Sequence, residues 1–102
     1  MKVEKVIFID EELQKLFEEL PENDPIKKAL IKAIQEIQVN PQCGRNVRKN
    51  LIPKKYNVNN LWIYNLPSAW RMIYSLAPGE IEIIGVILDW MNHKDYERLF
   101  NF

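Results

Sequence analysis

The chain has 102 residues, of which 47% are hydrophobic and 11% aromatic. This size and composition are typical of one globular domain, here residues 1–102, with a hydrophobic core of its own. There is no run of about 18 apolar residues, and the charged first segment lacks the pattern of a secretory leader, so we expect no membrane contact and a cytoplasmic location. The single cysteine, Cys43, can form no internal disulfide, which fits a reducing compartment.

The formal net charge is zero, but the charges are unevenly distributed along the chain. Residues 1–24 carry eight acidic side chains and three lysines, whereas residues 37–79 contain no Asp or Glu. The six basic residues of this second segment are Arg45, Arg48, Lys49, Lys54, Lys55 and Arg71. Such segregation can give a neutral protein a positive surface that holds phosphates. Ordinary solvated loop lysines are the alternative interpretation, and charge alone favours neither.

In chain order, the β-branched stretch 3–9 predicts a strand. Asp10 then occupies an N-cap position, and apolar residues at helical spacing predict a helix that ends at Pro21. Asp24 followed by Pro25 starts a second helix, whose apolar stripe ends at residues 40–41. Because the connection between the two helices is short, we expect an antiparallel helical hairpin.

Residues 41–60 have no clear periodicity and contain Gly44 and two prolines, so we expect a loop that holds at most a short strand or turn. Loops of this length in small domains are usually functional. Strands are predicted at 61–66, 69–76 and 81–88, the last being almost continuously apolar, as in a central strand covered on both faces. A short helix over 92–100 closes the chain. The order β-α-α-β-β-β-α predicts an α+β fold, with a small, mostly antiparallel sheet and the helical hairpin on one face.

Several kinds of site are excluded by the motifs. The chain has no phosphate-binding glycine loop, no Cys/His metal spacing and no Gly-x-Ser-x-Gly nucleophile elbow. We therefore expect neither a metal nor a cofactor. Cys43 has no histidine near it in sequence and is interpreted as an exposed thiol.

Arg71 interrupts an otherwise apolar strand. Strand alternation puts it on the opposite face from Trp70 and Met72. A guanidinium on a rigid strand is a good bidentate donor to a phosphate or a carboxylate. The alternative is an ordinary cross-strand pair with Glu80 or Glu82.

His93 is the single histidine of the chain and falls in the first turn of the last predicted helix. Asn92 is a suitable N-cap, and Asp95 stands where a capping box has its acidic residue. Met91 and Tyr96 have the spacing of a hydrophobic staple, which by itself accounts for Tyr96. The helix dipole favours a neutral His93 ring that can accept a proton, although a surface histidine in a first turn is at least as common.

The strands "LWIYNLPSAWRMIYSL" and "IEIIGVIL", followed by "HKDYERLF", resemble the RelE/ParE superfamily of type II toxin–antitoxin toxins over nearly the whole chain. The resemblance implies a toxin neutralised by a small antitoxin protein and touching DNA only through the antitoxin complex. RelE-like members cut mRNA in the ribosomal A site without a metal. In that reaction the substrate's 2′-hydroxyl attacks the adjacent phosphate and leaves a cyclic phosphate. ParE-like members act on DNA gyrase and are not nucleases.

The resemblance also implies roles for individual residues. Arg71 matches the strand arginine that grips the scissile phosphate, Lys54 and Lys55 fall in the basic loop, and His93 and Tyr96 fall where acid–base or base-stacking residues lie. The expected RNA-binding residues are Arg45, Arg48, Lys49, Lys94 and Arg98. The leading hypothesis is a RelE-like mRNA endoribonuclease. Two alternatives stay open: a ParE-like toxin that binds gyrase, or a degenerate member that retains only antitoxin and operator binding. The neutral net charge, unlike the basic composition of many ribosome-dependent members, keeps them open.

Overall fold

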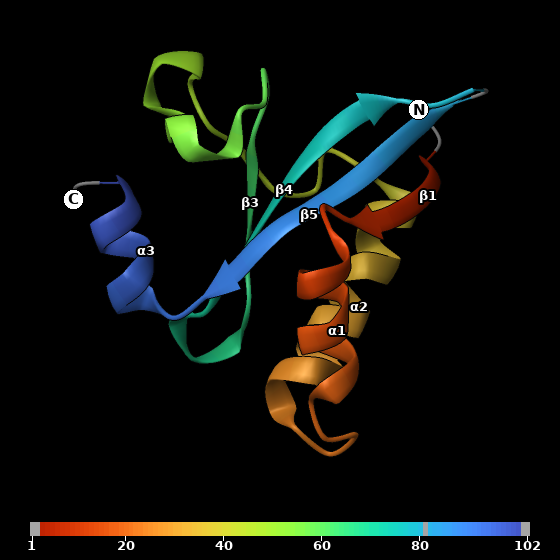
Figure 1. Cartoon of the computed structure of the whole chain (residues 1–102), viewed down its shortest axis with the longest axis vertical. Coiled ribbons are helices and arrows are strands. Elements are labelled where there is room, and N and C mark those ends of the chain that lie inside the picture. Colours follow the sequence, from red (N-terminus) through yellow and green to blue (C-terminus); the bar gives the residue numbers. More distant parts are fainter. Residues whose placement is uncertain (1–2, 81, 101–102) are drawn as a thin grey trace.

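The computed structural model describes residues 3–80 and 82–100 (Figure 1). Its elements in chain order are β1 (Val3–Phe8), α1 (Glu11–Glu19), α2 (Pro25–Val39), β2 (Arg45–Asn46), η1 (Lys49–Leu51), η2 (Lys54–Tyr56), β3 (Trp62–Asn65), η3 (Pro67–Ala69), β4 (Arg71–Pro78), β5 (Ile83–Met91) and α3 (His93–Phe100). The predicted order of helices and strands is confirmed. The predicted loop at 41–60 holds the two-residue strand β2 and two single 3₁₀ turns, η1 and η2, in line with the expected short strand or turn. The third 3₁₀ turn, η3, lies between β3 and β4.

The five strands form one sheet in the order β1-β5-β4-β3-β2. All pairs are antiparallel except β1–β5, which is parallel, so the predicted α+β class with a mostly antiparallel sheet is confirmed. The strand β5 lies between β1 and β4, as expected for a continuously apolar segment. It runs to Met91, three residues beyond the predicted end at residue 88, because residues 89–91 continue the ladder with β4. The predicted first residue of this strand, residue 81, lies outside the described residues.

The strand β4 starts two residues later than predicted, because the β3–β4 connection is a compact turn. Pro67–Ala69 form η3, in which Ser68 has φ 59° and Ala69 has φ 63°. The turn is closed by a backbone hydrogen bond from the Leu66 N–H to the Trp70 carbonyl, at 2.9 Å. This connection brings Arg71 to the very start of β4.

The helical hairpin packs on one face of the sheet. Both predicted N-caps are confirmed: the Asp10 carboxylate accepts the Leu13 N–H and the Asp24 carboxylate accepts the Ile26 N–H, each at 2.8 Å. The buried residues of this layer are Leu30, Ala33, Ile37, Leu66, Met72, Tyr74 and Ile87. Lys27 of α2 is a buried charged residue. It is only 6% exposed, because its ammonium donates to the Leu20 carbonyl and to Glu22 across the helical turn.

The opposite face of the sheet is covered by α3 and by the 47–58 segment. The buried residues of this second layer are Leu61, Ile63, Ile73, Leu88, Met91 and Tyr96. Met72 and Tyr74 therefore point to the hairpin and Ile73 points to α3, as strand alternation requires. Since Arg71 shares the face of Ile73, the predicted orientation of its side chain is confirmed, and it faces α3.

Tyr74 anchors the start of the basic segment. Its buried hydroxyl donates to the Pro41 carbonyl at 2.8 Å and accepts the Gly44 N–H at 3.0 Å. A Cβ on Gly44 would lie 2.8 Å from both the Ile63 carbonyl oxygen and the Tyr74 hydroxyl, so only glycine fits this close approach. The chain thereby leaves α2 and enters β2 in a defined position, which fixes Arg45.

Candidate functional site

Arg71 and Tyr96 form the centre of the candidate site. Arg71 stands opposite Asn65 of β3 and Met91 of β5. The centre of its guanidinium lies 5.3 Å from the centroid of the Tyr96 ring. One terminal nitrogen, Nη1, donates to the Trp70 carbonyl at 3.0 Å, while the buried Nε has no hydrogen-bond partner among the described residues. An unpaired buried donor is uncommon in a native fold. Because this nitrogen is enclosed, the part of Arg71 open to a ligand is the outer end of its half-buried guanidinium.

Arg45, on the edge strand β2, reaches the same tyrosine on the same face of the sheet. Its Nη2 donates to the Tyr96 hydroxyl at 2.5 Å. Tyr96 is 4% exposed, so two guanidinium groups converge on one buried ring. The sequence marked Arg45 only as one of several basic residues, because nothing local relates it to a tyrosine 51 positions later. The pairing of β2 with β3 brings the two together.

His93 lies beside this cluster. The predicted cap of its helix is confirmed, since the Asn92 side chain accepts the Asp95 N–H at 2.9 Å. Its ring centroid is 6.3 Å from that of Tyr96, and its Nε2 is 3.2 Å from an oxygen of Glu97. About half of the His93 side chain is exposed. His93 and Arg71 therefore both neighbour the Tyr96 ring, and His93 faces solvent. Its carboxylate partner, which sequence reasoning missed, could have been found from the i, i+4 spacing.

Lys54 and Lys55 lie in a different place. Both belong to η2, and the Lys55 ammonium lies 5.2 Å from the centroid of the Tyr56 ring. The Tyr56 hydroxyl donates to Asp89 at 3.2 Å. Burial of this phenol, reinforced by the adjacent carboxylate, raises its pKa. A hollow of about 420 Å³ separates η2 from the last helix, and its lining residues are Lys55, Asp89, Trp90, Met91, Asp95, Arg98 and Leu99.

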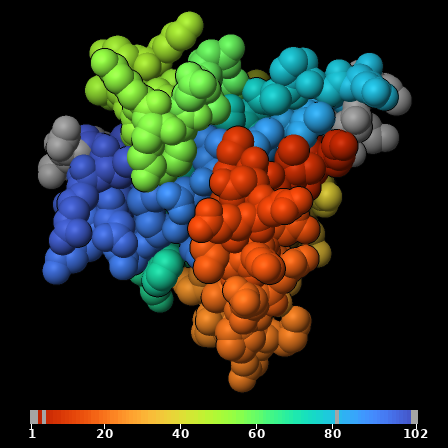
Figure 2. Space-filling model, viewed as in Figure 1, coloured from red at the N-terminus to blue at the C-terminus, as the bar shows by residue number. Residues whose placement is uncertain are grey.

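A second hollow, of about 210 Å³, lies between β2 and α3. Its lining residues are Arg45, Asn46, Val47, Arg48, Leu51, Ile63, Tyr96 and Phe100. Tyr96 and Phe100 face this hollow, whereas Asp95, Arg98 and Leu99 face the one beside Lys55. The helix α3 thus stands between two groups of predicted cations. In Figure 2 the green 50–58 region lies beside the blue C-terminal helix, and the orange α1–α2 connection occupies the far end of the molecule.

The other predicted basic residues surround these hollows or lie in the open. Arg48 also lines a shallow depression with Lys49, Asn59 and Asn60. Lys54 and Lys94 are exposed, and the Arg98 guanidinium is 3.9 Å from Asp95 on the outer side of α3. The alternative for Arg71, a pair with Glu80 or Glu82, is wrong. Pro78 pairs with Ile83 at one end of the β4–β5 ladder and Arg71 lies at the other, about seven residues or 23 Å away.

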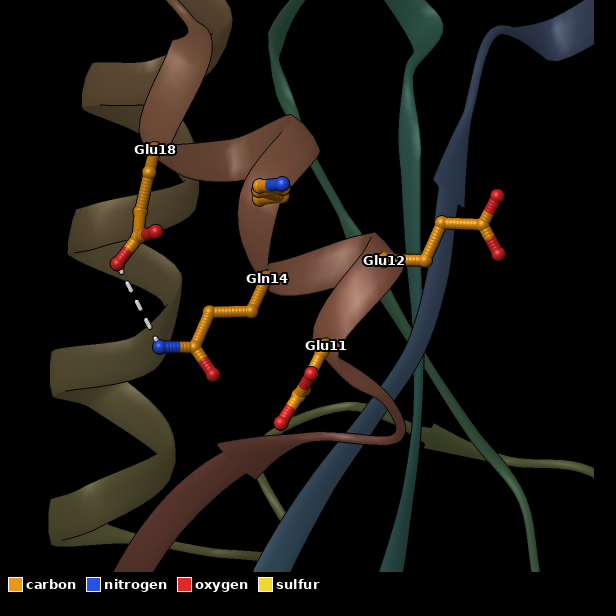
Figure 3. A pocket seen from close by; sticks show the side chains of 5 residues that line it. Glu11, Glu12, Gln14 and Glu18 are labelled. Carbon is orange, nitrogen blue, oxygen red and sulfur yellow. Dashed lines mark hydrogen bonds between the residues drawn. The ribbon is translucent and has the colours of Figure 1, made fainter.

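Another hollow is on the outer surface of α1 (Figure 3). It measures about 490 Å³, and its lining residues are Glu11, Glu12, Gln14, Lys15 and Glu18. Its side chains come from one helix and project separately into solvent, with one contact drawn, from the Gln14 amide to Glu18 at 3.4 Å. Three carboxylates beside one lysine repel a phosphate, so we regard this hollow as part of an acidic surface. The described residues contain no group of three or more His, Cys, Asp or Glu side chains placed to hold a metal ion.

No family model matches the chain, and a comparison with curated proteins found no match. In three dimensions the chain is similar to the E. coli toxin RelE in the free state, solved as a mutant in which two arginines are replaced by alanine. The TM-score is 0.58 at 15% sequence identity, over 95% of this chain and 90% of that one. The molecule has the fold of a RelE toxin, so the fold implied by the sequence resemblance is confirmed. No helix within residues 3–80 and 82–100 is both long and apolar enough to cross a membrane.

Proposed function

We propose that this protein is the toxin of a type II toxin–antitoxin system and that it cuts mRNA on the ribosome in the RelE manner. The observation that carries the proposal is the convergence of Arg71 and Arg45 on Tyr96, beside a half-exposed His93, in a molecule with the RelE fold. Two guanidiniums and a proton carrier on one sheet face form a site for phosphate chemistry.

The reaction is attack of the substrate's 2′-hydroxyl on the adjacent phosphate. The bond from oxygen 2′ to phosphorus forms and the bond to the 5′-oxygen breaks, which leaves a 2′,3′-cyclic phosphate and a free 5′-hydroxyl. The reaction requires a base for the attacking hydroxyl, positive charge for the phosphorane and an acid for the leaving oxygen. Each of these has a candidate among the residues of the site.

Arg71 and Arg45 supply the positive charge. The Nε of Arg71 is enclosed, so we assign the phosphate contact to the outer, terminal nitrogens of its half-buried guanidinium, whose planar form suits two oxygens at once. Arg45 bonds the hydroxyl of the tyrosine whose ring contacts Arg71. We assign it the second contact, in place of Lys54 and Lys55, because Lys55 lies across α3. The lysines and Arg48 then serve to attract the RNA backbone.

His93 carries the proton. When its Nε2–H donates to Glu97, the ring is held in one tautomer and Nδ1 is left to exchange a proton with the substrate. A carboxylate that orients a histidine in this way is a recurrent arrangement in hydrolytic sites. Tyr96 is buried, so we assign it the positioning of Arg45 and Arg71 rather than the stacking of a base.

The first testable prediction concerns cleavage. In a translation extract, wild-type protein is expected to cut mRNA in the presence of a chelator and to leave 2′,3′-cyclic phosphate ends. Arg71→Ala and Arg45→Ala should each lower the single-turnover rate by about 10²–10³, and His93→Ala by about 10²–10⁴. Lys32→Ala, an exposed change on α2 that also removes one charge, is the control and should cut normally.

The result that overturns this proposal is arrest of growth by wild-type protein with intact mRNA. Inhibition of purified gyrase supercoiling by the same protein would then assign it to the ParE type of action. Normal cleavage by both Arg71→Ala and His93→Ala would also contradict the assigned roles, because each removes a group that the chemistry needs. For the partner, co-expression of a neutralising antitoxin should abolish cleavage.

A further inference from the structure

The 210 Å³ hollow between β2 and α3 is distinct from the phosphate-binding groups but shares Arg45 and Tyr96 with them. Its floor is apolar, from Val47 and Ile63. Its side walls are a ring from Phe100, 5.0 Å between centroids from Tyr96, and the side chain of Arg48. The proposed chemistry does not use the part of this hollow that lies beyond Arg45.

We infer that this hollow binds the base of the nucleotide next to the scissile phosphate, which makes it a specificity-determining subsite for single-stranded RNA. The inference rests on the proposed function. Bases of single-stranded RNA are bound by stacking on aromatic rings and on arginine guanidiniums, and Phe100 with Arg48 offers both. The volume is below the 300–1,000 Å³ of pockets for drug-sized ligands, which suits one heterocycle and not a whole nucleotide.

Position supports the same ligand. A phosphate held at Arg45 and Arg71 has its own nucleosides on either side, within one sugar of the hollow that starts at Arg45. The edge of β2 adds hydrogen-bonding capacity for a base. Val47 donates its N–H inward to the Leu61 carbonyl, so by strand alternation the N–H and carbonyl of Asn46 point away from β3, and Asn46 lines the hollow.

Charge favours RNA over an apolar side chain of a protein partner. Among the described residues that line the hollow, two are arginines and none is acidic. The neighbouring depression adds Lys49 to Arg48 and is also free of carboxylates. A nucleotide with a phosphate on each side of its base is attracted by these basic residues. A leucine or phenylalanine of a protein partner would be stabilised only by contact with the apolar floor.

The experiment measures single-turnover cleavage of ribosome-bound mRNAs that carry each of the four bases, or an abasic ribose, at the positions flanking the cut. Wild-type protein should cut the abasic substrate about five- to 150-fold more slowly at one flanking position, the span expected for one stacked base. In Arg48→Ala and Phe100→Leu this difference should shrink and the order of preferred bases should change. Lys32→Ala should reproduce the wild-type pattern.

Failure of the inference and failure of the proposed function are separate outcomes. If wild-type protein cuts no mRNA, the proposed function fails and this subsite fails with it. If wild-type protein cuts, but its preference among bases is the same in Arg48→Ala and Phe100→Leu, the inference alone is overturned. Unchanged base preference together with lost antitoxin binding would assign the hollow to the protein partner.

Discussion

At the scale of single residues, Tyr96 shows how one side chain serves both the core and the site. Its spacing from Met91 explains it as a hydrophobic staple, and both residues lie in the buried layer beneath α3. Its hydroxyl also accepts a hydrogen bond from Arg45, and its ring lies under the guanidinium of Arg71. In the sequence, packing alone explains Tyr96. In the structure, Tyr96 also contacts the arginines of β2 and β4.

Tyr74 has a comparable position in the other layer, where its hydroxyl bonds to Pro41 and Gly44. Tyr74→Phe leaves these buried backbone groups without their partner, so we predict that the free energy of unfolding falls by about 1–3 kcal/mol. Urea denaturation measures it. Tyr64→Phe is the matched control, because the hydroxyl of the half-buried Tyr64 donates to the Glu36 carboxylate and not to backbone groups. A loss from Tyr64→Phe as large as that from Tyr74→Phe would contradict this account of the basic segment's anchor.

At the scale of elements, the helix α3 determines the arrangement of the candidate site. It has eight residues, a length that is marginal for a helix on its own, and it carries His93 and Tyr96. The side chain of Asn92 caps its first turn. Tyr96, Leu99 and Phe100 pack its inner side against the sheet. Because one short helix separates the two hollows, its placement decides which cations can act together.

We therefore predict that Asn92→Ala lowers both stability and activity. Loss of the cap should reduce the free energy of unfolding by about 1 kcal/mol and slow cleavage, since His93 lies in the first turn. Denaturation and single-turnover cleavage measure the two effects. Asn23→Ala, an exposed asparagine in the α1–α2 turn, is the control for the composition change. Full cleavage by Asn92→Ala would separate the helix start from the chemistry.

At the scale of the whole molecule, the neutral net charge conceals two surfaces of opposite sign. The acidic side chains of α1 lie on the hairpin face of the sheet, whereas the basic 45–55 region covers the face of α3. Under the proposed function, this separation would let RNA approach one face of a protein without net charge. The absence of Asp and Glu from residues 37–79 is the feature of the sequence that predicts the basic surface.

Alkaline pH should weaken the fold as a whole. Burial, followed by the hydrogen bond to Glu36, raises the pKa of Tyr64 from 10.0 to about 12, and burial also raises the pKa values of Tyr56 and Tyr74. Above pH 10 the unfolded chain has released these protons while the folded chain still holds them. The free energy of unfolding should therefore fall as the pH rises from 10 to 12. Urea denaturation at each pH measures the slope, and in Tyr64→Phe it should be shallower. A pH-independent stability in this window would contradict the burial of these phenols.

The sequence by itself determined the local elements and the fold class. The caps at Asp10, Asp24 and Asn92 and the alternation around Arg71 are local signals, because a cap or a strand face depends on residues a few positions apart. The continuous apolar run that became β5 likewise indicated an internal strand. The end of β5 could not be predicted from the sequence, because its last residues are in a strand only through their pairing with β4.

Only the tertiary structure decided which cations share a site. Arg45 and Tyr96 are 51 positions apart, and no sequence period relates residues joined by the pairing of β2 with β3. The same packing put Lys55 on the far side of α3, although it lies closer than Arg45 to the strand of Arg71 in sequence. Side-chain convergence depends on how layers stack, and stacking is a property of the assembled sheet. The sequence therefore predicted which residue types form the candidate site, but not which of them contact one another.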